Sequence, residues 1–326
     1  MVHKRKALAG VAVLLLVSGA LAASVAPELP AAEAEARYAT PPSRFLEVDG
    51  LRIHYRDQGQ GPLLVLLHGS NASLFTWEGW VRELSSHYRV ISLDLPGHGL
   101  TGPDPKQRYT WTGMAEVLEA FRARLGLERF HLAGNSMGGA VAWHYALLHP
   151  EHVDRLILVD AAGYPRDEPA PLVFRLARTP VLGELLSHVT PRQVIEKNVR
   201  AVYGDPSKVK EADVDRYYAL LLREGNREAT RERLRATTDD GLWRRLGEVR
   251  APTLVLWGAK DTWILPRYGE RFDRDVPDSR LVVYPGLGHV PMEEDPASTA
   301  ADVRRFLSEE GTVTAPRAPD SGAATP

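Results

Sequence analysis

The chain has 326 residues, of which 44% are hydrophobic and 25% are charged, so it is long enough for one large α/β domain with an insertion. A formal net charge of −2, without a long basic stripe, argues against a nucleic-acid partner. The absence of cysteine excludes disulfides, thiol nucleophiles and cysteine-based zinc sites. The eleven histidines show no metal-ligand spacing, so we do not expect a metal site.

The first residues have the pattern of an export signal. Basic residues at 4–6 precede an uncharged apolar run, and Ala20-Leu21-Ala22 offers a cleavage site. The run is also long enough for residues 7–26 to remain as a membrane anchor. Both alternatives place the body outside the cytoplasm, in the periplasm or beyond, and the membrane is contacted only through this segment. Residues 1–26 are therefore assigned to a signal peptide or anchor, and 27–42 to a linker rich in Ala, Glu and Pro.

The folded part of the chain is predicted to start with a β-hairpin. Residues 44–48 and 51–56 alternate apolar and polar side chains around Asp49-Gly50, which is a strong hairpin signal. Residues 62–67 are continuously apolar, as expected of a strand buried on both faces of a parallel sheet. The strand ends at His68-Gly69-Ser70-Asn71. In an enzyme built around a nucleophilic serine, this loop would supply an oxyanion-hole amide, at Ser70, whereas a simple strand-end turn would leave His68 solvated.

A further strand and helix follow this loop. Residues 89–93 form the strand, which runs into Asp94-Leu-Pro-Gly-His-Gly99, and residues 115–125 form a helix with one apolar face. Asp94 precedes a Pro-Gly turn. Its carboxylate is predicted to bind neighbouring backbone amides and fix its own loop, in preference to acting as a catalytic acid.

The chain is organised around Gly134-Asn-Ser-Met-Gly138. This stretch lies between a short apolar strand at 129–133 and an apolar, alanine-rich helix at 139–147. A serine at so sharp a turn needs small neighbours, and the two glycines provide them. The turn points Ser136 at the helix N-terminus, where free amides favour a developing negative charge. Ser136 is therefore the predicted nucleophile, and the Met137 amide is the predicted partner of Ser70 in the oxyanion hole.

The alternation of strand and helix breaks after the buried strand 155–159, which ends at Asp160. The next buried strand is 253–257, and the sequence between them has only helical patterns. Within them, arginines and glutamates interleave over 223–235, which indicates a solvated helical face. We expect a doubly wound, mostly parallel sheet with an inserted helical cap. The predicted parts are a core at 43–164, the cap at 165–248, a second core part at 249–310 and a disordered tail at 311–326.

An acidic residue and a histidine follow the last two strands. Asp261 comes after 253–257, and His289 comes after 280–284. Because the carboxyl ends of parallel strands meet at one edge of a sheet, both side chains should converge there with Ser136. The predicted triad uses His289 as the base and Asp261 to orient the imidazole, with Asp160 as the reserve acid.

These motifs resemble the α/β-hydrolase superfamily, in the esterase-like branch that uses serine and carries a helical cap. The resemblance covers about residues 43–308. It implies a hydrolase that cleaves a carboxylic ester or similar small acyl substrate through an acyl-enzyme, without a cofactor. Haloalkane dehalogenases and epoxide hydrolases share the layout but carry aspartate where this chain has Ser136.

Two alternatives stay open. The Gly-Asn-Ser-Met-Gly-Gly motif is also similar to the carbon–carbon bond hydrolases of aromatic ring-cleavage pathways. Those enzymes typically have a Gly-rich loop after His-Gly and a Trp after the catalytic His, where this chain has Asn71-Ala-Ser and Val290. The other alternative is a ligand-binding protein that keeps the fold with little turnover.

Overall fold

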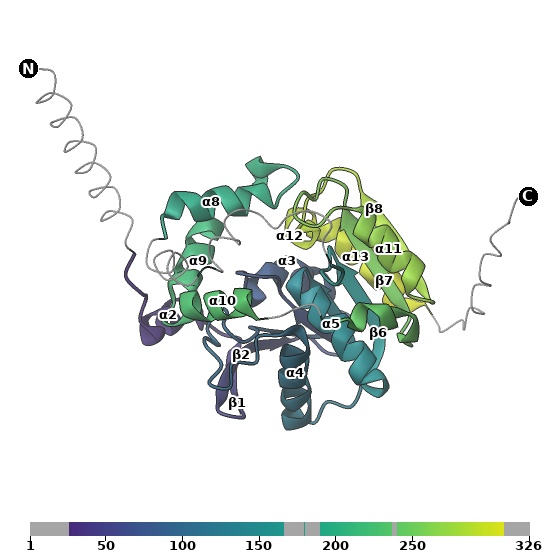
Figure 1. Cartoon of the computed structure of the whole chain (residues 1–326), viewed down its shortest axis with the longest axis horizontal. Coiled ribbons are helices and arrows are strands. Elements are labelled where there is room, and N and C mark those ends of the chain that lie inside the picture. Colours follow the sequence, from purple (N-terminus) through teal and green to yellow (C-terminus); the bar gives the residue numbers. More distant parts are fainter. Residues whose placement is uncertain (1–25, 166–178, 180–189, 237–239, 310–326) are drawn as a thin grey trace, which may run out of the picture.

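The computed structural model describes residues 26–165, 179, 190–236 and 240–309 (Figure 1). Residues 1–25, which hold nearly all of the predicted signal or anchor, and the whole of the predicted tail at 311–326 are outside these ranges. The strands are β1 (Ser43–Val48), β2 (Leu51–Gln58), β3 (Leu63–Leu67), β4 (Arg89–Leu93), β5 (Phe130–Asn135), β6 (Val153–Val159), β7 (Thr253–Gly258) and β8 (Ser279–Tyr284).

All eight strands form one sheet in the order β1-β2-β4-β3-β5-β6-β7-β8. The strands β1 and β2 form an antiparallel hairpin, β2 is antiparallel to β4, and the remaining pairs are parallel. At the hairpin turn Asp49 and Gly50 both have positive φ, of 54° and 83°, as a two-residue turn of this hand requires. The structure therefore confirms the predicted doubly wound, mostly parallel sheet.

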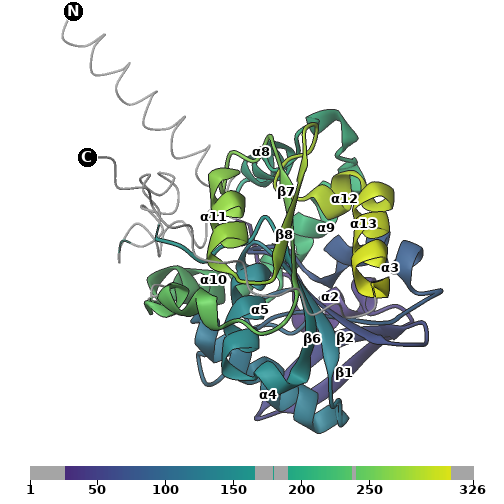
Figure 2. The same cartoon turned by 90° about the vertical axis from the view of Figure 1, so that its right-hand side faces the viewer.

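Helices cover both faces of this sheet. They are α3 (Glu78–Leu84), α4 (Trp111–Leu125), α5 (Met137–Leu148), α11 (Arg267–Asp275), α12 (Pro291–Glu294) and α13 (Pro296–Ser308). Along β3, Val65 and Leu67 pack in the core under α4 and α5, whereas Leu64 and Leu66 pack in the core under α3 and α13. Successive strand residues face opposite sides, so a strand covered on both sides is continuously apolar. Figure 2 shows α3 and α13 on one side of β7 and β8, and α11 on the other.

The segment between β6 and β7 contains the cap helices α8 (Arg192–Ala201), α9 (Glu211–Leu222) and α10 (Asn226–Arg235), together with short 3₁₀ turns at Pro206–Lys208 and Leu242–Glu248. The described part of this insertion has no strand of the central sheet. This confirms the predicted helical cap. Figure 1 shows the three cap helices grouped beside one another, at the left of the view.

The segment assigned to a linker contains a helix, α2 (Ala31–Tyr38), so that prediction is wrong. Leu29 pairs with the cap through two backbone bonds of 2.8 Å, one to the Leu222 carbonyl and one from the Glu224 amide. Ala34 is fully buried in a small apolar cluster with cap and core residues. Tertiary contacts therefore order this Ala- and Glu-rich stretch. No described helix has the length and apolar composition required to cross a membrane.

Candidate active site

Ser136 lies between the end of β5 and the start of α5, in a backbone conformation of φ 53° and ψ −116°. Such values are disfavoured for a residue with a side chain and are typical of a nucleophile elbow. A Cβ at Gly134 would lie 2.1 Å from the Gly138 carbonyl oxygen, and a Cβ at Gly138 would lie 2.2 Å from the Leu67 carbonyl oxygen. Both glycines are thus required by close backbone approach, as the sequence predicts.

The loop after β3 lies against this turn. A Cβ at Gly69 would be 3.3 Å from the Ser136 Cβ, so the loop and the turn are in contact. Within the part of the chain that the structure describes, we find no acceptor for the backbone N–H of Ser70 or of Met137. Met137 is the first residue of α5, where an N–H has no partner within the helix. Ser70 follows Gly69 in this loop and Met137 follows Ser136 in the turn, so both predicted oxyanion donors belong to the two segments that are in contact.

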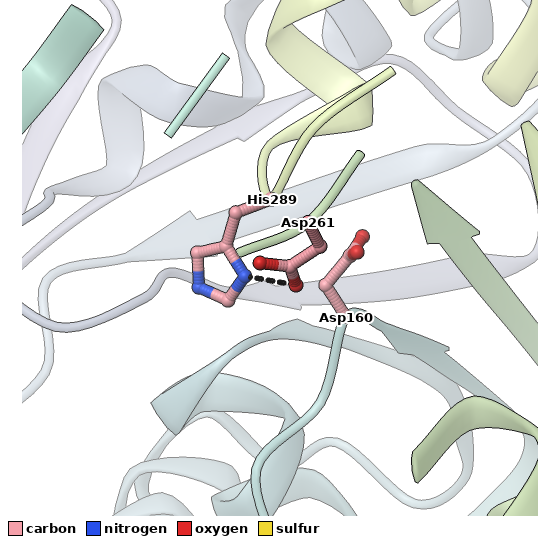
Figure 3. A group of neighbouring side chains, drawn as sticks. All are labelled: Asp160, Asp261 and His289. Atoms are coloured by element: carbon pink, nitrogen blue, oxygen red, sulfur yellow. Dashed lines mark hydrogen bonds and ion pairs between the residues drawn. The ribbon is translucent and has the colours of Figure 1, made fainter. Parts of the chain in front are cut away.

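His289 and Asp261 are joined by a hydrogen bond. The His289 Nδ1 lies 2.7 Å from Asp261 Oδ2, and Figure 3 shows the two side chains facing each other. The other oxygen of Asp261, Oδ1, accepts from the amides of Trp263 at 2.7 Å and Ile264 at 3.0 Å. These bonds fix the carboxylate, and a carboxylate at Nδ1 leaves Nε2 free to accept a proton. No hydrogen bond between Ser136 and His289 is present among the described residues.

Asn135, which the sequence did not single out, positions the histidine. Its Nδ2 donates to the carbonyl oxygens of His289 at 3.0 Å and Val159 at 3.1 Å. On the other side, the His289 N–H donates to the carbonyl of Val202, at the end of cap helix α8, at 2.7 Å. The His289 backbone is therefore held by the turn that carries Ser136 and by the cap.

Ser136 and His289 line one cavity of about 430 Å³ between the core and the cap. This volume is in the range of small-molecule sites. Its wall combines residues 69–72 of the loop after β3, which include Ser70, with apolar and polar side chains of the cap. The cap residues that line it include Val194, Ile195, Val199, Val202, Tyr217, Leu221, Arg227, Arg231 and Leu234.

Two residues of the cap correct the prediction of a solvated helical face at 223–235. Arg227 and Arg233 are 7% and 8% exposed. Arg233 donates from Nη2 to Asn71 Oδ1 at 3.1 Å, and burial lowers the pKa of its guanidinium to about 10. The α10 helix thus turns part of its charged surface inward, onto the loop that carries Ser70.

Asp94 and His68 stabilise the loops by accepting hydrogen bonds from backbone amides, as predicted for Asp94. The Asp94 carboxylate accepts from the amides of Leu74 at 2.7 Å and Leu100 at 2.8 Å, and lies 2.7 Å from His54 Nδ1. His68 is fully buried and not solvated, and its Nε2 accepts from the Leu95 amide at 3.0 Å. Burial lowers the pKa of His68, which keeps the ring neutral as an acceptor.

Asp160 lies in the same cluster but is not the partner of His289. Its Oδ1 accepts from the Gly258 amide at 3.0 Å. One side-chain atom each from Asp160, Asp261 and His289 lie within 4.8 Å of one another (Figure 3). Two carboxylates and an imidazole are a set that could hold a divalent metal. In this geometry, however, His289 Nδ1 and Asp261 Oδ2 are hydrogen-bonded to each other.

The sequence matches the family described as alpha/beta hydrolase fold over residues 62–296. A 2-hydroxy-6-oxononadienedioate/2-hydroxy-6-oxononatrienedioate hydrolase of Paraburkholderia phymatum is 33% identical in an alignment of 258 residues that covers 73% of this chain and 85% of that protein. The structure of a membrane phospholipase A has a TM-score of 0.70 and 29% identity, over 93% of this chain and 98% of the other. A thermophilic esterase from Thermogutta terrifontis has a TM-score of 0.69 and 25% identity, over 81% and 97%.

Fold and site together define a doubly wound α/β protein whose cavity lies at the carboxyl ends of its strands, under a helical insertion. The family model covers well over half of the chain, and the chain therefore belongs to the alpha/beta hydrolase family.

Proposed function

We propose that this chain is a serine hydrolase that cleaves a carboxylic ester, or a similar acyl substrate, through an acyl-enzyme intermediate. One observation supports this most. Ser136, on its strained turn, lines the same cavity as His289, whose Nδ1 is bonded to Asp261. A nucleophile, a base and a residue that orients the base are the parts that two-step acyl transfer requires.

In the proposed mechanism the Nε2 of His289 takes the proton as the Ser136 oxygen attacks the carbonyl carbon. Asp261 holds the proton on Nδ1 and stabilises the imidazolium that forms. The amides of Ser70 and Met137 bind the oxyanion, each lowering the barrier by about 3 kcal/mol. His289 then protonates the departing alcohol and activates a water that releases the acid. The described residues include no Ser136–His289 hydrogen bond; in this mechanism the bond forms in the complex with substrate, where catalytic hydrogen bonds commonly reach their working geometry.

The cavity wall favours an apolar acyl chain. Six of the cap residues on it are aliphatic, and burying a chain against them is favourable by roughly 0.8 kcal/mol per methylene. The likeness to a membrane phospholipase A, which covers 93% of this chain, supports the same class of substrate. We therefore propose esters of medium-length fatty acids as substrates.

A 2-hydroxy-6-oxo dicarboxylate is the second candidate substrate. The 33% identity with the hydrolase of Paraburkholderia phymatum favours it, and Arg227 and Arg231 on the cavity wall could meet a carboxylate. Against it, Asn71-Ala-Ser and Val290 stand where ring-cleavage hydrolases typically have a Gly-rich loop and a Trp. Spectrophotometric assay of such a dienoate beside the esters decides between the two.

The nucleophile is tested with a fluorophosphonate probe and a series of p-nitrophenyl esters from acetate to laurate. Ser136→Ala should abolish labelling and lower turnover about 10⁶-fold, because the covalent route is lost. Ser70→Ala is the matched control: Ser70 lines the same cavity, but the variant keeps the backbone amide that the proposal uses. It should label and turn over like the wild type. Labelling that survives Ser136→Ala, or is lost in Ser70→Ala, would contradict the assignment.

A further inference from the structure

Two buried carboxyl groups stand side by side in the site, and their hydrogen bonds are unequal. Asp261 is 3% exposed and receives three donors, two backbone amides and His289. Asp160 is fully buried, receives the Gly258 amide at Oδ1, and has no hydrogen-bond partner at Oδ2 among the described residues. Figure 3 shows the Asp160 side chain next to that of Asp261, and a carboxylate oxygen of each lies within 4.8 Å of the other. The mechanism proposed above uses only Asp261.

Two adjacent carboxyl groups shielded from water do not both ionise, because each negative charge opposes the other. Hydrogen-bond donors stabilise the ionised form, so the charge belongs on Asp261, which has three, and the proton belongs on Asp160, which has one. The pKa of Asp160 agrees with this assignment of the proton. Burial, and then the charge of Asp261, raise that pKa well above its ordinary range.

We propose that Asp160 is a positioning residue, a neutral carboxylic acid whose Oδ2–H donates a hydrogen bond to Asp261 and so holds that carboxylate toward His289. A proton on Oδ2 gives the otherwise unpartnered atom a role. It also adds a fourth donor to Asp261 without adding charge. The catalytic consequence rests on the proposed function, whereas the protonation state does not.

The backbone of Asp160 points to suitable variants. Its φ is 44°, in the left-handed region that Asn and Gly adopt more readily than other residues. Its amide donates to the Leu256 carbonyl at 2.9 Å, which fixes this conformation. Asp160→Asn therefore keeps the backbone and offers an N–H donor in place of the O–H. Asp160→Gly keeps the backbone and removes the donor.

The protonation state of Asp160 is tested by infrared spectroscopy at neutral pH, as the difference between the spectra of the wild type and of Asp160→Asn. The wild type should show the carbonyl stretch of a protonated, buried carboxyl group, and Asp160→Asn should lack it. Because the band needs no turnover, Ser136→Ala should retain it, and this separates failure of the inference from failure of the proposed function. A wild-type spectrum without the band, or a band that persists in Asp160→Asn, would overturn the inference.

The positioning role is tested by turnover of p-nitrophenyl esters. Asp160→Asn should stay within about threefold of the wild type, and Asp160→Gly should lose about 10- to 100-fold in kcat, the usual cost of removing an outer partner. KM should change little, since Asp160 does not line the cavity. Equal losses in both variants, or no loss in Asp160→Gly, would refute the role. If Asp160→Gly does not fold, the infrared result on Asp160→Asn decides.

Discussion

Asp160 and Asp261 are the same type of residue in one buried cluster, yet their surroundings give them different protonation states. The pKa of Asp160 is raised well above 3.8 in the folded chain, first by burial and next by the charge of Asp261. His289 lies in the same cluster, and Glu294 and Tyr284 interact electrostatically with Asp160 as well. A buried aspartate that stays protonated links folding stability to pH.

This linkage has a defined sign. Above the unfolded-state pKa of about 3.8 the unfolded chain releases the proton that the folded chain keeps, so rising pH favours unfolding by up to about 1.4 kcal/mol per pH unit. The amide that Asp160→Asn introduces does not titrate. From pH 4 to pH 8, therefore, Asp160→Asn should gain stability relative to the wild type, and below about pH 3.8 the difference should level off. Urea unfolding across this range measures it, and a constant difference would contradict the prediction.

At the scale of single residues, strand-end position predicted that Asp261 and His289 would lie together, and it placed Ser136 and His289 on one cavity. Ser136, Asp261 and His289 follow β5, β7 and β8, and parallel strands bring their carboxyl ends to one edge. Asn135 was not predictable. It occupies a variable position of the motif, and its acceptors on Val159 and His289 lie 24 and 154 residues away along the chain. Spacing indicates which strand ends converge, but not which side chains bind there.

At the scale of elements, one carboxylate joins the cap to the loop that carries His289. Glu294, at the end of α12, accepts from the amides of Gly204 and Asp205 in the cap, each at 2.8 Å, and of Gly288 at 2.9 Å. The contact is close, because a Cβ at Gly288 would lie 2.4 Å from the Gly204 nitrogen. The cap and the predicted base are therefore held by the same side chain.

Replacing Glu294 by glutamine should weaken this junction. The amide side chain lacks the charge and has a single acceptor oxygen, so one backbone N–H loses its partner. We expect the free energy of unfolding to fall by about 2 kcal/mol and turnover to fall by about tenfold or more through misplacement of His289. Glu270→Gln, on the exposed side of α11, is the matched control and should leave both unchanged. A Glu294→Gln variant that equals the control in both measurements would contradict this role.

Elements with strong periodicity were predictable, and elements that depend on distant contacts were not. The β1–β2 hairpin and the apolar strands have local patterns that determine them. The helix α2 has the Ala- and Glu-rich composition of a linker, and a helix of eight residues is not stable alone. Its order comes from the cap, nearly two hundred residues further along the chain, through Leu29 and Glu224. Nothing within the segment itself indicates that partner.

At the scale of the whole molecule, this packing places the start of the described chain at the cap. Glu28 and Leu29 bond to backbone amides or carbonyls of the turn between α9 and α10. Any segment that precedes residue 26 is therefore attached close to the roof of the cavity. We propose that this segment directs export of the catalytic body, by cleavage or as an anchor, in keeping with the basic residues 4–6 and the apolar run that follows.

Fusing residues 1–42 to a reporter that is active only outside the cytoplasm should give signal, because Lys4, Arg5 and Lys6 hold the N-terminus inside while the remainder crosses. The same fusion with the three basic residues changed to glutamate is the control, and its signal should fall. Fractionation then separates the two fates: cleavage yields a soluble chain that starts near Ala23, whereas an anchor leaves the full-length chain in membranes until detergent is added. A catalytic body found soluble in the cytoplasm with Met1 still at its N-terminus would contradict both fates.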